Sequence, residues 1–235
     1  MGDAEALKRR AAERAAEWIG EGMTLGLGTG STVRHLLDVI AERRAGGAWA
    51  GVVGVPTSVD TERRARALGI PLATLAERPK LDLTIDGADE VDPELRLIKG
   101  LGGALLREKI VAAASAELVI VADESKVVER LGTRAPLPVE VDPFGEPVQP
   151  GFLRSLGCEP ALRRGAGGAP FVTDGGNHVL DCRFPGGIGD PEGLERALAL
   201  RPGIVESGLF LGMATAAVIA GADGVRVMRR AGGAL

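Results

Sequence analysis

Leu81-Asp82-Leu83-Thr84-Ile85-Asp86-Gly87-Ala88-Asp89-Glu90 is the stretch of this chain that says most about its fold. The apolar alternation over 81–85 predicts a short β-strand. The strand leads into a glycine-containing turn that carries Asp86 and Asp89. Because ligands of open α/β sheets bind beyond the carboxyl ends of the strands, these carboxylates are expected at a ligand-binding edge.

Helical and strand patterns alternate on both sides of this stretch. Helices are expected over 3–19, 31–45, 58–68 and 103–116, and strands over 23–27, 51–55, 72–75 and 117–122. Such alternation predicts an α/β fold with a Rossmann-like, mostly parallel sheet and helices on both faces.

Prolines and glycines become denser from Gly132 onward. Short strands are expected over 137–141, 159–162, 171–173 and 179–182, with helices over 147–156 and 191–200. This pattern predicts a small α+β, ferredoxin-like second domain. The apolar run 209–220 and the segment 224–228 are assigned to the first domain again, so the expected domains are 1–131 with 204–235, and 132–203.

Composition excludes several classes of partner. The net charge is -4 and aromatic residues make up 3% of the 235 residues, so neither a basic footprint for nucleic acid nor a base-stacking platform is expected. No apolar run is long enough to span a bilayer, and the first helical pattern lacks a signal-peptide core. The sequence predicts a cytoplasmic protein without a membrane partner, in which Cys158 and Cys182 stay reduced.

Gly26-Leu27-Gly28-Thr29-Gly30-Ser31-Thr32 lies between an expected strand and an expected helix. Small residues, hydroxyl donors and free N–H groups at a helix start are typical of an anion site and indicate phosphate as the ligand. A P-loop requires a lysine after its last glycine, and none follows Gly30, so this stretch is not a P-loop. It also departs from the dinucleotide fingerprint, because Ser31 occupies the last glycine position. The alternative is a tight turn with Ser31 as the helix cap.

Asp86, Asp89 and Glu90 place three acids within five residues. They can exchange protons with a substrate, ligate a metal or cap a solvated turn. Metal-dependent isomerases and hydrolases usually add histidine, and this chain has only His35 and His178. Neither histidine is expected to carry the mechanism.

Two further segments carry candidate cations and a base. Lys99 precedes a glycine-rich stretch, and Glu108 falls about one turn into the expected helix, although the charges at 107–109 also fit a solvated helix face. Lys126 follows the apolar strand, where it can reach a phosphate or simply belong to a polar loop. The chain has five lysines among 28 basic residues, so a lysine in such a loop favours a functional role.

Taken together, these segments resemble the type A ribose-5-phosphate isomerase family over most of the chain. The matching residues are Gly28–Thr32, Pro56–Ser58, Asp86–Glu90, Lys99-Gly100, Arg107–Lys109, Asp123 with Ser125-Lys126, Pro136–Val141, Thr173-Asp174 with Asn177, Pro202–Val205 and Gly208–Phe210. One departure is Leu101, which interrupts the glycine run that often follows the lysine of the family.

The resemblance implies interconversion of ribose 5-phosphate and ribulose 5-phosphate in the pentose phosphate pathway, with no metal or organic cofactor. It implies a homodimer, with a tetramer as the alternative. Glu108 matches the proton-shuttling base, and Asp86, Asp89 and Lys99 match residues around the reacting carbons. The implied substrate-binding positions are Lys8, Thr29, Gly30, Ser31, Thr32, Gly87, Ala88, Gly100, Leu101, Gly102 and Lys126.

Three other functions stay open at this point. A glutamate-using acyl-CoA transferase would employ Glu108 as a nucleophile. An amino-sugar phosphate deaminase is disfavoured because no histidine is well placed. A non-catalytic sugar-phosphate sensor would bind ligand without needing Glu108.

Overall fold

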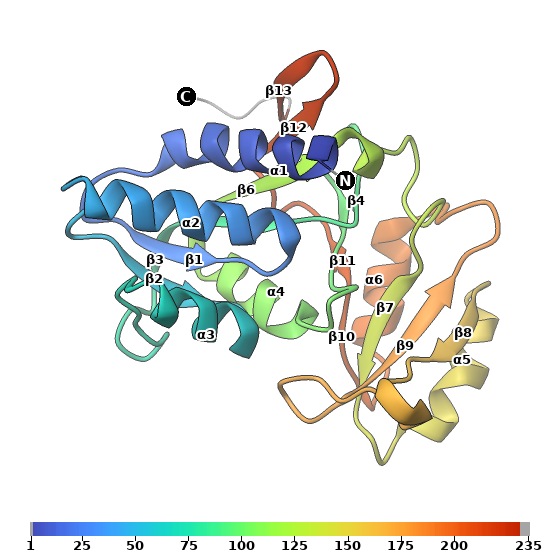
Figure 1. Cartoon of the computed structure of the whole chain (residues 1–235). Helices are drawn as coiled ribbons and strands as arrows, with labels where there is room; N and C mark the ends of the chain where they lie inside the picture. The colour runs from blue at the N-terminus through green and yellow to red at the C-terminus, as the bar shows by residue number, and fades with distance from the viewer. Residues whose placement is uncertain (1, 231–235) are drawn as a thin grey trace. The chain divides into compact units, whose positions relative to one another are not determined.

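The computed structural model describes residues 2–230, which form two compact units (Figure 1). Within the described residues, the first unit comprises 2–88, 107–126 and 212–230, and the second comprises 89–106 and 127–211. The expected domain boundaries at 131/132 and 203/204 stay a prediction. No helix within residues 2–230 is long and apolar enough to cross a membrane.

The first unit contains a six-stranded sheet in the order β13-β12-β6-β3-β1-β2. Its strands are β1 (Thr24–Leu27), β2 (Val53–Pro56), β3 (Leu81–Gly87), β6 (Ser115–Asp123), β12 (Ala216–Gly221) and β13 (Gly224–Arg229). Every neighbouring pair is parallel except β12 with β13. The predicted mostly parallel sheet is therefore confirmed.

Helices cover both faces of this sheet. On one face, α1 (Gly2–Ala15), η1 (Ala16–Trp18) and α2 (Ser31–Ala45) pack on alternate strand residues such as Leu25, Leu27 and Ile85 (Figure 1). The other face receives α4 (Leu105–Ala113), whose Val111 lies against Gly26 of β1. The remaining elements are α3 (Val59–Ala67), which contacts β2, and η2 (Glu124–Lys126).

The second unit contains a four-stranded antiparallel sheet and a three-stranded one. The first has the order β10-β7-β9-β8 and the second β11-β5-β4. Their strands are β4 (Glu90–Val91), β5 (Leu97–Ile98), β7 (Leu137–Val141), β8 (Glu159–Leu162), β9 (His178–Arg183), β10 (Ile204–Ser207) and β11 (Leu209–Phe210). Its helices are η3 (Glu146–Val148), α5 (Gln149–Ser155), η4 (Ala166–Gly168) and α6 (Pro191–Ala199), and the predicted α+β class of this part is confirmed.

Two predicted strands were wrong. Residues 72–75 make a single bridge, between Leu72 and Gly54, before Thr74 and Glu77 close a turn through side-chain hydrogen bonds. Residues 171–173 form no ladder, because the N–H of Phe171 bonds to the carbonyl of Arg163 and that of Thr173 to the carbonyl of Asn177. The predicted helix over 103–116 is shorter, since Gly103 has a φ of 83° and the following strand already begins at Ser115.

Candidate active site

The carboxyl ends of β1 and β3 meet where the strand order reverses. After β1 the chain moves to one side to form β2, and then returns to the other side of β1 to form β3. Crevices at such switch points bind ligands in open α/β sheets. Gly28 and Thr29 follow β1 at this point and Asp86 is the last residue but one of β3, so these predicted site residues share one edge of the first unit.

Asp86 is held tightly at this edge. Its side chain is 1% exposed, and Oδ1 accepts hydrogen bonds from the backbone N–H groups of Thr29 at 2.9 Å and Gly87 at 2.7 Å. A Cβ placed on Gly28 would lie 2.2 Å from the same oxygen. The carboxylate thus occupies the space that glycine leaves open, and its position is fixed by the backbone of the loop that follows β1.

Thr29 organises this loop through its hydroxyl group. Its Oγ1 lies 2.8 Å from Thr57 Oγ1 and donates to Ser58 Oγ at 2.8 Å. Thr61 Oγ1 extends the cluster and donates to the carbonyl of Gly28 at 2.8 Å. Thr57, Ser58 and Thr61 are buried. None of them was predicted as a site residue, although Thr57 and Ser58 belong to the Pro56–Ser58 motif. A hydroxyl directly after the neighbouring strand is the signal that marks them.

Ser31 and Thr32 form the first turn of α2. Gly30 is the N-cap residue, with a φ of 119°, and no side-chain hydrogen bond caps this end of the helix. The first N–H groups of a helix lack partners within the helix and favour an anion. Ser31 is exposed and Thr32 half-buried, so this turn presents hydroxyl and amide donors beside Asp86 and Thr29.

Glu108 shares a sheet face with Asp86. Ala114, just after α4, accepts a hydrogen bond from the N–H of Leu81 at the start of β3, while Val111 lies against Gly26 further along the strands. The helix therefore runs antiparallel to the strands, and Glu108 lies one turn closer to their carboxyl ends. Asp86 points to this face because Thr84, two residues earlier, also faces Gly26.

Burial decides between the two readings of the charges at 107–109. Glu108 is 3% exposed, so it is not part of a solvated helix face. Glu108 is thus a buried carboxylate on the sheet face of Asp86, and its role as a base stays a prediction.

Lys126 and Lys8 come from other elements of the first unit. Lys126 ends η2, directly beyond the carboxyl end of β6. Asp123 shapes this turn by accepting a hydrogen bond from the N–H of Ser125 at 2.9 Å. Lys8 lies on α1 with its Nζ 2.7 Å from Glu5, and this hydrogen bond, followed by one from His35, holds the pKa of Glu5 below its usual range.

The second unit contains the predicted residues Asp89, Lys99 and the loop 100–102, whereas Gly87 and Ala88 belong to the first unit. Lys99 is 2% exposed, its backbone N–H donates to the carbonyl of Gly208 at 2.9 Å, and its Nζ is 5.4 Å from the centre of the Phe210 ring. Asp89 Oδ2 accepts the N–H of Leu101 at 2.9 Å. This bond joins the predicted Asp89 to the predicted loop 100–102.

Leu101 fits the loop despite replacing a glycine of the family pattern. The positive φ angles fall on Gly100, at 95°, and on Gly103, at 83°. Leu101 itself needs no left-handed conformation, and its side chain is exposed.

Glu90 differs from Asp86 and Asp89 in the partners of its carboxylate. Its Oε2 accepts the N–H of Gly132 at 2.5 Å, and its Oε1 accepts those of Arg134 at 2.6 Å and Ala135 at 2.7 Å. The residue is fully buried. Its oxygens thus fix the 132–135 segment, and of the three clustered acids Glu90 has a structural role. Across residues 2–230, no group of three or more His, Cys, Asp and Glu side chains is arranged to hold a metal ion.

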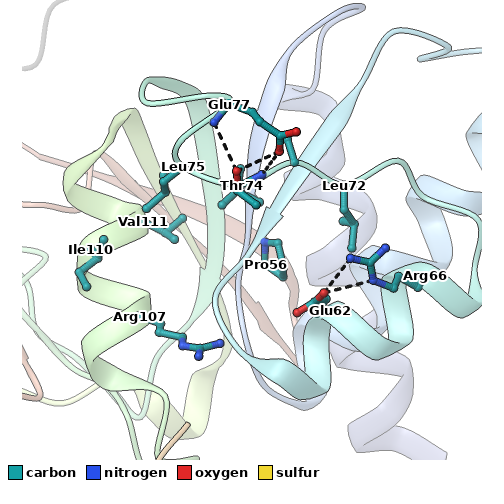
Figure 2. Close-up of a pocket in the computed structure, with 12 residues that line it drawn as sticks. Pro56, Glu62, Arg66, Leu72, Thr74, Leu75, Glu77, Arg107, Ile110 and Val111 are labelled. Carbon is teal, nitrogen blue, oxygen red and sulfur yellow. Dashed lines mark hydrogen bonds and ion pairs between the residues drawn. The ribbon is translucent and has the colours of Figure 1, made fainter. Parts of the chain in front are cut away.

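A cavity of about 510 Å³ lies elsewhere in the first unit (Figure 2). It is lined by α3, the end of β2, the 72–77 segment and α4, and its lining includes Arg107 and the ion pair of Arg66 with Glu62. Glu77 closes one side, and the N–H and hydroxyl of Thr74 hold its pKa below the usual range. None of the predicted site residues lines this cavity.

Comparison with known proteins identifies the family. The family model of ribose 5-phosphate isomerase A (phosphoriboisomerase A) matches residues 53–224. The chain is 60% identical over 218 residues to ribose-5-phosphate isomerase A of Roseiflexus castenholzii, covering 93% of both chains. It is 56% identical over 227 residues to the Gloeobacter violaceus protein of that name, covering 96% of this chain and 97% of the relative.

Solved structures agree with these relatives. A D-ribose-5-phosphate isomerase in complex with phospho-erythronic acid superposes with a TM-score of 0.94 at 36% identity, covering 97% of this chain and 99% of the other. The ribose 5-phosphate isomerase of Plasmodium falciparum gives 0.92 at 39% identity, with the same coverage. The resemblance seen in the sequence motifs is confirmed: the chain belongs to the ribose 5-phosphate isomerase A family.

Proposed function

We propose that this protein interconverts ribose 5-phosphate and ribulose 5-phosphate, with Glu108 as the base. Family membership over nearly the whole chain supports the reaction. The observation that carries the choice of base is the burial of Glu108 on the sheet face that also receives Asp86.

The reaction moves a proton between adjacent carbons. Glu108 removes the proton from C2 of the open-chain aldose and returns it to C1 of the enediolate. A positioned base contributes about 10²–10⁴-fold to such a step. The transient negative charge on the oxygens therefore requires stabilisation as well.

Lys99 and the N–H groups of Gly100 and Gly102 stabilise that charge, while the N–H of Leu101 binds Asp89 and so holds the turn in place. Preorganised donors of this kind are worth about 10²–10³-fold each when they act on a developing oxyanion. Lys99 is suited to the task because a buried ammonium acts in a medium of low dielectric. Asp86 and Asp89 exchange protons with the substrate hydroxyls during ring opening and the O1–O2 transfer.

The phosphate is assigned to the turn after β1 and to two lysines. Ser31, Thr32 and Gly30 supply donors at the start of α2, Thr29 orders their loop, and Lys126 and Lys8 supply positive charge. Gly87 and Ala88 line the substrate through their backbone. Phosphate contacts far from C1 and C2 orient the sugar for the proton transfer.

The remaining expectations complete the proposal. The protein works in the cytoplasm, in the non-oxidative branch of the pentose phosphate pathway, as a homodimer or a tetramer. It needs no metal or organic cofactor and binds neither nucleic acid nor membranes. Prolonged chelation should leave its activity unchanged, and sedimentation should give twice or four times the chain mass of 24.2 kDa.

Proton exchange tests the reaction directly. The protein is incubated with ribose 5-phosphate in deuterated water, and NMR follows label at C1 and C2. The proposal expects ribulose 5-phosphate to form and deuterium to enter at the carbon that Glu108 reprotonates. An absence of both product and exchange would overturn the function, and a covalent glutamyl adduct with an acyl-CoA would favour the transferase instead.

Phospho-erythronic acid is a suitable probe of the same site. Its carboxylate offers two oxygens where an enediolate carries O1 and O2, and it shares the terminal phosphate. We expect it to compete with ribose 5-phosphate.

A further inference from the structure

The turn Gly100–Gly103 is held by hydrogen bonds to both the N–H and the carbonyl of Leu101. Its ends are joined by a hydrogen bond from the N–H of Gly103 to the carbonyl of Gly100 at 2.9 Å. The N–H of Leu101 donates to Asp89, and the carbonyl of Leu101 accepts from Arg163 Nη1 at 2.9 Å. Arg163 thus contacts the segment that the proposed function uses to hold the substrate.

Arg163 is itself oriented by two neighbours. Its Nε and Nη2 donate to the two carboxylate oxygens of Asp181 on β9 at 2.9 Å and 2.5 Å. Its guanidinium carbon lies 5.6 Å from the centre of the Phe171 ring, a distance typical of a cation–π contact. The arginine side chain is only 13% exposed, so the two-point pair with Asp181 is largely shielded from solvent.

Phe171 contacts the turn as well. A Cβ placed on Gly103 would lie 2.4 Å from the ring, and Gly103 has a φ of 83°, so this position accepts only glycine. The N–H of Phe171 bonds to the carbonyl of Arg163 at 2.9 Å, which ties the two residues together. The turn is therefore fixed at its middle by Arg163 and at its end by Phe171.

We propose that Arg163, held by Asp181, is a positioning residue that sets the substrate-binding turn Gly100–Gly103 and, through Leu101, the carboxylate of Asp89. This inference rests on the proposed function, because the turn matters for turnover only if it contacts the sugar. A guanidinium is needed because it has three nitrogen donors in one plane. Nε and Nη2 bind the carboxylate of Asp181, and Nη1 binds the carbonyl of Leu101. A lysine presents its donors from a single nitrogen, so it does not reproduce the planar fork that spans Asp181 and the Leu101 carbonyl.

The test compares Arg163→Met with Arg164→Met. Arg164 is the adjacent residue, and its guanidinium donates instead to the carbonyl of Gly168 at 2.7 Å. For Arg163→Met we expect kcat/KM to fall about 10–100-fold, mainly through kcat, because small displacements of positioning groups are costly. KM should change little, since the proposed phosphate contacts are untouched.

A second readout separates positioning from general damage. The inhibition constant of phospho-erythronic acid should rise with Arg163→Met by about the factor lost in kcat/KM, because the carboxylate of the analogue uses the same donors. Loss of folded protein would leave that constant unchanged. Amide exchange should accelerate at Leu101 but not along β9.

Further variants keep the test decisive if Arg163→Met folds poorly. Arg163→Lys keeps the charge beside Asp181 and should still lose kcat/KM and analogue binding. Asp181→Asn should give a defect of the same kind, and the double variant should be no worse than Arg163→Met alone. Full activity and unchanged analogue binding in Arg163→Lys would overturn the inference, as would a fall in kcat/KM without weaker analogue binding.

The exchange measurement needs no substrate, which separates the two proposals. If the unaltered protein does not isomerise ribose 5-phosphate, the proposed function fails. If exchange at Leu101 is the same in the unaltered protein and in Arg163→Met, the positioning role fails whatever the activity.

Discussion

The carboxylate of Asp86 lies against Gly28, so that a single methyl group on the glycine would meet it. The hypothetical Cβ is 2.2 Å from Oδ1 and 2.6 Å from the Cα of Asp86. The same Oδ1 accepts the N–H of Thr29 at 2.9 Å. The spacing between the two neighbouring strands thus fixes the loop after β1 and the candidate acid together.

Gly28→Ala should therefore damage both the fold and turnover. The nearest atoms include backbone, which cannot rotate away, so we expect unfolding to become easier by about 1–3 kcal/mol. Displacement of Asp86 should lower kcat on the order of 10²-fold. Chemical denaturation and steady-state kinetics measure the two effects. The control is Gly151→Ala in α5, where a Cβ meets nothing within 4 Å and stability should be kept or slightly improved.

Glu108→Gln should abolish turnover while sugar phosphate still binds. The amide keeps the shape of the side chain but cannot accept the C2 proton. Calorimetric titration with phospho-erythronic acid checks binding, and NMR in deuterated water checks exchange. Glu117→Gln changes an exposed carboxylate of β6 and should behave like the unaltered protein. Near-normal turnover in Glu108→Gln would remove this residue as the base.

Lys126→Ala should raise KM for ribose 5-phosphate more than it lowers kcat. A hydrogen bond to a charged group contributes about 1.5–3 kcal/mol, which corresponds to an increase of about 10–100-fold in KM. The increase should shrink as salt is added, because salt screens the attraction between ammonium and phosphate. Lys80→Ala removes an exposed lysine of the same unit and serves as the control. An unchanged KM at low salt would remove Lys126 from the phosphate site.

Glu90→Gln should destabilise the protein without changing the chemistry of the site. Glu90 accepts hydrogen bonds from the N–H groups of Gly132, Arg134 and Ala135, and an amide offers only one acceptor atom. We expect the free energy of unfolding to fall by about 1.5–3 kcal/mol. Glu94→Gln is the matched control, since that side chain is 63% exposed. If the folded variant lost kcat while keeping its stability, Glu90 would be part of the site.

Both cysteines should react slowly with thiol reagents near neutral pH, because both are buried in the folded protein. The hydrogen bond shared with Cys158, together with burial, raises the pKa of Cys182 well above the ordinary range, so its reactive thiolate is scarce. The hydrogen bond from Cys182 lowers the pKa of Cys158, which should be labelled first. Mass spectrometry after labelling gives the order, and unfolding should expose both thiols at once. Rapid labelling of Cys182 in the folded protein would contradict this account.

Patterns of local spacing predicted most of the long elements. The α2 helix spans Ser31–Ala45 and β7 spans Leu137–Val141, as expected from their apolar periodicity. Short strands were harder, because their pairing partners decide whether they form. β10 (Ile204–Ser207) was not predicted, yet it pairs with β7, whereas 171–173 has strand-like residues and no ladder.

The candidate residues show the same division. Their types and order along the chain were enough to single out Asp86, Asp89, Lys99 and Glu108. Spacing alone did not separate Glu90 from the two aspartates, since its partners at 132–135 are more than forty residues away in the chain. Nor did it indicate Thr61 or Arg163, whose contacts with Gly28 and Leu101 depend on folding.

The sequence by itself determined the family, the alternation of strands and helices, and the residues that can carry proton transfer, because these depend on residue type and near-neighbour spacing. Only the tertiary structure decided that Asp86 is buried at the switch point, that Glu90 accepts the hydrogen bonds of the 132–135 segment, and that Arg163 contacts the turn at Leu101. These roles depend on burial and on hydrogen bonds between segments far apart in the chain, and neither is encoded in any local pattern.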